Sequence, residues 1–187
     1  MPHAERADAP PDGRFGAVEF RPIRPDDALE LIAFHGRLSP ESQYLRFFTA
    51  HPRLTAPEVT RFTSVDGHER IAIVAVLGGR IAGVARADRT DGGTAEVAVV
   101  VEDAVQHHGL GSALLDRVAD EARSVGMDTF EAEVLPTNRR MLDVFHHLGF
   151  PVTSRFGDGV VHLSFPIAPV SPYLQARAER ESTTGAG

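Results

Sequence analysis

The chain of 187 residues contains no cysteine and no tryptophan. Without cysteine it can form no disulfide and no zinc–thiolate site, and it has no thiol nucleophile. Chemistry in which the protein itself carries an acyl group on a cysteine is therefore excluded.

Long apolar runs and an excess of positive charge are also missing. No apolar run is long enough to span a membrane, and the N-terminus has no hydrophobic signal core, so we expect a cytoplasmic protein without a membrane partner. Acidic residues outnumber lysine plus arginine by 26 to 19, which gives a net charge of −7. This balance argues against a nucleic-acid partner, because phosphates require clustered cations. It favours a cationic substrate such as an amine.

The composition divides the chain into one domain and two tails. Residues 1–16 are small, polar and proline-bearing, and we expect them to be disordered. Residues 17–166 form one domain, which is long enough to bury a proper core. Residues 167–187 are predicted to be a partly disordered C-terminal extension, with a loose helix over residues 173–180 and a disordered end from residue 181.

Start signals predict two early helices. One opens at Pro25 and runs to about Arg37. Its inward face is predicted to consist of Leu29, Ile32, Ala33 and Phe34. A second opens at Ser39 and carries Tyr44, Leu45, Phe47 and Phe48. These side chains either pack on the core or form the wall of a substrate pocket, and we favour the core because aromatic residues are mostly buried.

Glycine-rich turns predict an antiparallel meander. Gly78 and Gly79 join strands over residues 69–77 and 80–87, and a turn at residues 90–93 leads into a strand over 94–101. Later in the chain we expect strands over residues 129–134, 151–155 and 160–165, with a helix over 138–148 between the first two.

Residues 96–126 are the centre of the chain. The buried strand Val97–Val101 leads into a glycine-bearing loop, which opens an amphipathic helix. Since the first N–H groups of a helix have no intrahelical partner, this arrangement suits a phosphate, although a tight turn that binds nothing has the same spacing. A Walker A loop would need Gly-Lys-Ser/Thr where the chain has Gly111-Ser112-Ala113. The dinucleotide fingerprint would need glycine at Leu114.

Gln106-x-x-Gly109-x-Gly111 resembles the acetyl-CoA loop of the GNAT N-acetyltransferases. The segment from Asn138 to Gly149-Phe150 is similar to a later family segment, and residues 39–48 are similar to the GNAT domain of bacterial Pat-type protein lysine acetyltransferases. The resemblance implies an α/β (α+β) fold. Its mixed, mostly antiparallel twisted sheet would have about seven strands, flanked by about four helices, with a β-bulge in the central strand.

The resemblance also implies a cofactor site. The pyrophosphate of acetyl-CoA would lie on Gln106, His107, His108, Gly109, Leu110, Gly111 and Ser112, and its pantetheine arm along Val99, Val100 and Val101. A backbone N–H near Val99 would stabilise the oxyanion. Asn138 would contact the cofactor, or it would only cap the helix that follows. Phe145 stands where the family often has a tyrosine that acts as the general acid.

Glu96 is the predicted catalytic residue. It is a lone carboxylate before a buried run, where desolvation would suit it to act as a general base. Without the resemblance, a solvent-facing or salt-bridged acid at a strand start is the better explanation. The adjacent pairs His107-His108 and His146-His147 lack further ligands at suitable spacing, so we expect no metal.

These features predict an acetyl-CoA-dependent N-acetyltransferase in which a primary amine attacks directly within a ternary complex. Acetyl-CoA would be a cosubstrate. The acceptor implied by the Pat-like residues is a protein lysine, such as one on an acyl-CoA synthetase. Two alternatives stay open: a small-molecule amine acetyltransferase, and a non-catalytic acyl-CoA-binding sensor. The sequence also leaves open whether the protein is a homodimer.

Overall fold

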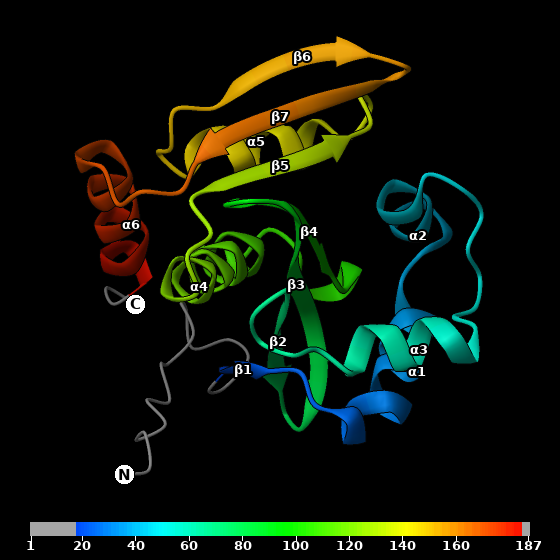
Figure 1. Ribbon diagram of the computed structural model, residues 1–187. Coiled ribbons are helices and arrows are strands. Elements are labelled where there is room, and N and C mark those ends of the chain that lie inside the picture. Colours follow the sequence, from blue (N-terminus) through cyan, green and yellow to red (C-terminus); the bar gives the residue numbers. More distant parts are fainter. Residues whose placement is uncertain (1–17, 185–187) are drawn as a thin grey trace, which may run out of the picture.

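The computed structural model describes residues 18–184, so the tail expected over residues 1–16 lies outside the described part of the chain. Within it are seven strands and six α-helices (Figure 1). The strands are β1 (Val18–Pro22), β2 (Arg70–Leu77), β3 (Arg80–Asp91), β4 (Thr94–Val101), β5 (Thr129–Val134), β6 (Thr153–Gly157) and β7 (Val160–Pro166). The helices are α1 (Ala28–Arg37), α2 (Pro40–Phe47), α3 (Ala56–Thr63), α4 (Leu110–Ser124), α5 (Arg139–His147) and α6 (Ser171–Thr184), with 3₁₀ turns at Pro25–Asp27 and Asp103–Val105.

All seven strands form one open sheet in the order β1-β2-β3-β4-β5-β7-β6. Neighbouring strands are antiparallel except β4 and β5, which run parallel for three residue pairs that end at Glu96 opposite Glu131. Beyond Glu96 the two strands separate, and the sheet opens into two halves that diverge in Figure 1. The predicted mixed, mostly antiparallel seven-stranded sheet is confirmed.

The bulges lie on β3 and not on the central strand β4. Thr90 is the extra residue opposite β4, and Ala82 is the extra residue opposite β2. From Ala95 to Val101 the register of β4 with β3 is regular. The predicted bulge in β4 is therefore wrong, and the early end of its pairing with β5 is what separates the two strands.

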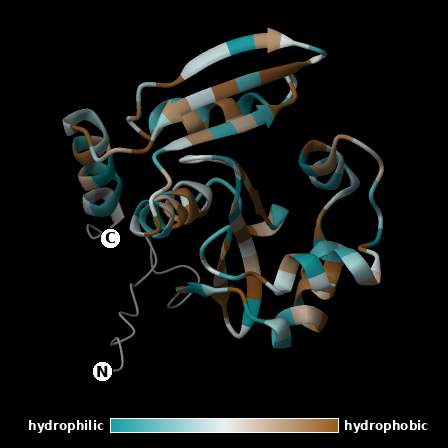
Figure 2. Ribbon diagram, viewed as in Figure 1, coloured by the Kyte–Doolittle hydropathy of each residue, from teal (hydrophilic) through white to brown (hydrophobic). Residues whose placement is uncertain are grey.

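Helices cover both faces of the sheet, and there are six of them where about four were expected. Alternate residues of β2 point to opposite faces, so Ile71 and Ile73 belong to a core under α4, while Ala72 and Val74 belong to a core under α1. Figure 2 shows the apolar stretches of these inner strands and the apolar side of α4. Within residues 18–184, no helix combines the length and the apolarity that a membrane crossing requires.

The inward face of α1 differs from the prediction. Leu29 and Ile32 are 82% and 46% exposed, and Ala33 is also exposed. The buried stripe contains Leu31, Phe34 and His35, whose Nε2 lies 2.6 Å from the carbonyl oxygen of His51. The pattern of apolar residues alone predicted the wrong face of α1, because the face that is buried includes the polar residue His35.

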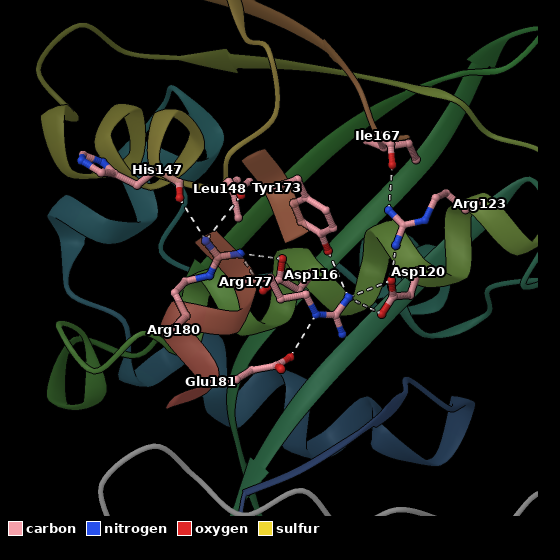
Figure 3. Close-up of polar contacts among 10 residues, drawn as sticks. All are labelled: Asp116, Asp120, Arg123, His147, Leu148, Ile167, Tyr173, Arg177, Arg180 and Glu181. Atoms are coloured by element: carbon pink, nitrogen blue, oxygen red, sulfur yellow. Dashed lines mark hydrogen bonds and ion pairs between the residues drawn. The ribbon is translucent and has the colours of Figure 1, made fainter. Parts of the chain in front are cut away.

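The C-terminal extension forms α6, which packs beside α4 (Figure 3). Tyr173 is fully buried, and its ring stacks on Phe150 at a centroid distance of 4.0 Å. Arg177 and Arg180 reach carboxylates of α4, Asp120 at 3.0 Å and Asp116 at 3.1 Å. Residues 181–184, which were predicted to be disordered, continue the helix, because these contacts anchor it.

Candidate active site

A cavity of about 790 Å³ lies where β4 and β5 separate. Five segments form its walls: α2, the second half of β4, the loop and first turn of α4, the end of β5, and the first turns of α5. Segments far apart in the sequence therefore meet at the opening of the sheet.

The predicted site residues converge on this cavity, with one exception. Its lining includes Glu96, Val99, Val100, Val101, Gln106, His107, Gly109, Leu110, Gly111, Ser112, Asn138 and Phe145. His108 is half-buried and is not part of the lining. His107 has a left-handed backbone, with φ of 71°. The chain turns at that residue, so the next side chain leaves the wall.

The N-terminus of α4 faces the cavity. Gly109, Leu110, Gly111 and Ser112 all line it, and the first N–H groups of a helix have no partner within the helix. Gly109 caps α4 with φ of 77°, a left-handed conformation that glycine adopts without steric cost. The free N–H groups and the helix dipole together favour an anion at this end of the cavity.

Two arginines that the sequence reasoning missed add positive charge at the same end. Arg139 and Arg140 open α5 and line the cavity. Arg140 donates to Oε1 of Gln106, whose Nε2 donates to the Val101 carbonyl at 2.9 Å. Gln106 thus ties α5 to the end of β4. The charged residues just after Asn138 were the sequence signal that could have identified these arginines.

No group of three or more potential metal ligands gathers anywhere in residues 18–184.

The edge of β4 forms one wall. On one side this strand pairs with β3 as far as Val101, but on the other its pairing with β5 ends at Glu96. The backbone groups of the following residues that point toward β5 therefore have no partner in the sheet. An unpaired strand edge is a template for another extended chain.

Glu96 lines the cavity at the point where the strands part, and its side chain is exposed. The burial expected for this carboxylate is therefore absent, because its side chain lies in the cavity lining and not in the core. Arg46 of α2 lies close enough to interact with it. Burial lowers the pKa of Arg46 to about 10, aided by repulsion from Arg86 and opposed by Glu96 and Asp88.

The two predicted site residues of α5 have structural partners as well. Asn138 caps the helix, since its Oδ1 accepts a hydrogen bond from the Met141 N–H at 3.1 Å. Phe145 is 2% exposed, and its ring packs against Phe165 at a centroid distance of 5.7 Å. Phe145 therefore presents an apolar edge to the cavity and contributes no proton donor.

Helix α2 forms the wall opposite β5. Leu45, Arg46, Phe47 and Phe48 line the cavity, and none of them is fully buried. Core packing, the alternative that the sequence favoured, is wrong for Leu45, Phe47 and Phe48, and Tyr44 is exposed and belongs neither to the core nor to the cavity lining. The single buried side chain of α2 is Gln43, which donates to the carbonyl groups of His35 and Leu38. A polar anchor leaves the apolar side chains free to face the cavity.

Asp103 holds α2 in place. Its carboxylate accepts hydrogen bonds from the Ser39 N–H at 2.9 Å, the Ser39 hydroxyl at 2.7 Å and the Ser42 hydroxyl at 2.8 Å. Burial alone would raise the pKa of Asp103, but these hydrogen bonds outweigh it and the pKa is lowered. The helix that walls the cavity is thus fastened to the turn that follows β4.

Known proteins share this fold. The model of the acetyltransferase (GNAT) family matches residues 39–150, more than half of the chain. The acetyltransferase PA5475 of Pseudomonas aeruginosa is 30% identical over 144 residues, which span 74% of this chain and 76% of that protein. The GNAT domain of S. lividans PAT is 42% identical with a TM-score of 0.77, over 81% of this chain and 91% of that one.

A more distant structure shows the same fold with a ligand. YncA of Salmonella typhimurium, which was solved with its cofactor acetyl-CoA, is 23% identical with a TM-score of 0.63, over 82% of this chain and 96% of that one. Together, the opened sheet, the glycine loop at the N-terminus of α4 and the family match show that the chain belongs to the GNAT acetyltransferase family.

Proposed function

We propose that this protein transfers the acetyl group of acetyl-CoA to a primary amine, by direct attack within a complex that holds both substrates. The observation that carries the proposal is the unpaired edge of β4, which runs along a cavity that ends at the N-terminus of α4. A strand edge suits the amides of a pantetheine arm, and a helix N-terminus suits a pyrophosphate. Acetyl-CoA carries both groups.

In this reaction the amine nitrogen forms a bond to the acetyl carbon, the carbon–sulfur bond breaks, and CoA leaves as a thiolate. An alkylamine such as lysine has a pKa of about 10.4, so the attacking nitrogen must lose a proton. We assign the acceptance of that proton to Glu96, directly or through a water. The backbone N–H near Val99 is assigned to the oxyanion of the tetrahedral intermediate.

The leaving group does not demand an acid from the protein. A thiol has a pKa of about 8.5, so a thiolate departs readily near neutral pH. This is consistent with Phe145, which has no proton to give. Because the chain has no cysteine, an acetyl-cysteine intermediate is not available.

We propose a protein lysine as the acceptor, such as one on an acyl-CoA synthetase. The support is the 42% identity with the GNAT domain of S. lividans PAT. A small-molecule amine is the alternative substrate, and a sensor that binds acyl-CoA without turnover is the alternative function.

The test is a thiol-release assay with acetyl-CoA, run on an acyl-CoA synthetase and on a panel of small amines. We expect Glu96→Gln to lower kcat by about 100- to 10,000-fold, the range of general base catalysis, while calorimetry shows unchanged acetyl-CoA binding. The matched control is Glu131→Gln, which removes the carboxylate opposite Glu96 on β5, outside the cavity lining.

An unchanged rate in Glu96→Gln would reject Glu96 as the base. Binding of acetyl-CoA without turnover on any acceptor would support the sensor. The chain contains no lysine, so acetyl-lysine found by mass spectrometry comes from the acceptor alone.

A further inference from the structure

A second, smaller cavity adjoins the first on the face of the sheet that α1, α2 and α3 cover. Its volume is about 40 Å³. Arg46, Phe47, Ala98 and Val100 line both cavities, so the small one opens beside the large one. Apolar side chains form most of its wall, which also includes His35, Arg46 and Arg86.

Arg86 is a buried cation whose guanidinium hydrogen bonds are incomplete. It is 7% exposed, and its Nε and Nη2 atoms are buried without a hydrogen-bond partner. Asp88 forms an ion pair with Arg86, but its Oδ1 lies 3.7 Å from Nε, too far for a hydrogen bond, and this oxygen is also buried without a hydrogen-bond partner. The ring of Phe62 lies 4.6 Å below the guanidinium carbon. A buried guanidinium normally has all of its N–H groups paired, so two unpaired nitrogens call for an explanation.

Arg46 brings a second guanidinium to the same place. Burial is the main cause of the lowered pKa of both arginines, and for Arg46 repulsion from Arg86 adds to it. The two carboxylates near these arginines, Asp88 and Glu96, do not neutralise them fully. Asp88 is shared with Arg61, whose Nη2 lies 3.6 Å from its Oδ2, and the side chain of Glu96 is exposed.

The position of Arg86 relates it to the proposed chemistry. Arg86 pairs with Ala98 across β3 and β4, and Asp88 pairs with Glu96. Cross-strand partners share a face, and same-face residues of a strand are roughly 7 Å apart. Arg86 therefore lies on the same face as Glu96, two residues further along the strand pair, and Arg46 reaches this region from α2, where it lines both cavities.

We infer that Arg46 and Arg86 form a subsite for a carboxylate of the acceptor, so that the acceptor is an amine that also carries a carboxylate. This inference rests on the proposed acetyl transfer to an amine. A planar carboxylate would fill the small cavity, accept hydrogen bonds from the unpaired nitrogens of Arg86, and neutralise the two adjacent cations. The carboxylate belongs either to an acidic side chain beside a target lysine or to a free amino acid.

The kinetic test compares acceptors that differ only in that charge. One arm uses free amino acids against their carboxamides, and the other uses lysine peptides with glutamate or glutamine beside the lysine. Where the protein accepts both members of a pair, we expect kcat/KM to be about 10- to 100-fold higher for the acid than for the amide. This factor corresponds to the free energy of a hydrogen bond to a charged group. The arm that shows the preference identifies the source of the carboxylate.

In Arg86→Met the ratio of kcat/KM for the acid over the amide should fall to about one, while calorimetry shows unchanged acetyl-CoA binding. Arg86→Lys, which keeps the charge but not the fork of donors, should retain part of the preference. Arg53→Gln removes an exposed arginine from the loop between α2 and α3 and serves as the control. Equal rates on acid and amide in the wild type would overturn the inference and leave the acetyl transfer intact.

A binding test is independent of turnover. Propionate should raise the Tm of the wild type above that in sodium chloride of equal ionic strength, and this difference should vanish in Arg86→Met. Propionate stabilisation without any acetyl transfer would support the carboxylate subsite while rejecting the proposed function. No stabilisation of the wild type by propionate, together with equal rates on acid and amide, would reject the subsite.

Discussion

Around Glu96, three carboxylates lie in a row on one face of the sheet. Asp88 is its partner on β3 and Glu131 its partner on β5. Like charges directly opposite each other destabilise a sheet, so this row is costly for folding alone. Within this row only Glu96 lines the cavity, since Asp88 and Glu131 are absent from its lining, so Glu96 is the carboxylate that we propose to meet a protonated amine, next to the proposed subsite of Arg46 and Arg86. Opposite charges on neighbouring positions of one face are what an acceptor with both an amine and a carboxylate requires.

Phe145 allows a test of whether the reaction lacks an acid. We expect Phe145→Tyr to change kcat by less than tenfold, because a thiolate with a pKa of about 8.5 needs little assistance. The added hydroxyl enters a nearly closed site, so the free energy of unfolding should fall by about 1 kcal/mol. Steady-state kinetics and thermal unfolding measure the two effects. A tenfold or larger rise in kcat would mean that protonation of the leaving group limits the natural enzyme.

At the scale of elements, the attachment of α2 to Asp103 gives a prediction about pH. The folded-state pKa of Asp103 is lowered, so its stabilising contribution is present above the unfolded pKa of about 3.9 and is lost as pH falls through the folded pKa. Asp103→Ala should cost no more than about 1 kcal/mol at neutral pH, because the site is exposed and screened.

The measurement is thermal unfolding of both proteins from pH 7 downward. Their difference in stability should stay constant to about pH 4 and shrink below it. Since α2 walls the cavity, KM for the acceptor should also rise in Asp103→Ala. A stability difference that grows in acid would contradict this role for Asp103.

The elements themselves were largely predictable, but the faces that they bury were less so. Gly78 and Gly79 indicated the β2–β3 hairpin, and the loop at Gly109 indicated the start of α4. Such turns can be predicted because the backbone conformation that they need favours particular residues, glycine above all, at that position. The orientations of α1 and α2 depended on buried polar groups, His35 and Gln43, whose partners are distant backbone carbonyls. Such tertiary hydrogen bonds leave no periodic signal.

Most of the candidate site was predictable because it follows one continuous motif. Glu96 and the loop through Ser112 lie on consecutive elements, and a resemblance of sequence is enough to place them together. Arg46 and Arg86 were not found, because they come from α2 and β3 and meet only in the folded chain. A lone arginine in a strand carries no indication that its nitrogens are buried and unpaired.

At the scale of the whole molecule, α6 connects α4 and α5, two helices that line the cavity. Gly149 has φ of 92°, and a Cβ added there would lie 2.7 Å from the Pro172 carbonyl oxygen. This glycine therefore ends α5 and also makes room for α6. Arg180 reaches further, because it donates to the His147 and Leu148 carbonyls of α5 and to both carboxylate oxygens of Asp116 on α4. One side chain thus joins three helices, two of which form walls of the cavity.

Arg180→Met should therefore be among the most destabilising changes outside the core. Asp116 is 7% exposed, so removal of its partner leaves a buried carboxylate, which costs about 3–5 kcal/mol. Arg177→Met is the matched control on the same helix. Its carboxylate partners Asp120 and Glu181 are more exposed, and it also donates to the Tyr173 hydroxyl at 3.0 Å, so the expected cost is lower, about 1–2 kcal/mol. Urea unfolding measures both costs.

The double variant Arg180→Met with Asp116→Leu separates the ion pair from the other contacts of Arg180. It should regain most of the lost stability, because no buried charge then remains. If it does not, the hydrogen bonds from Arg180 to the carbonyl groups at the end of α5, and not the ion pair, hold α6 in place.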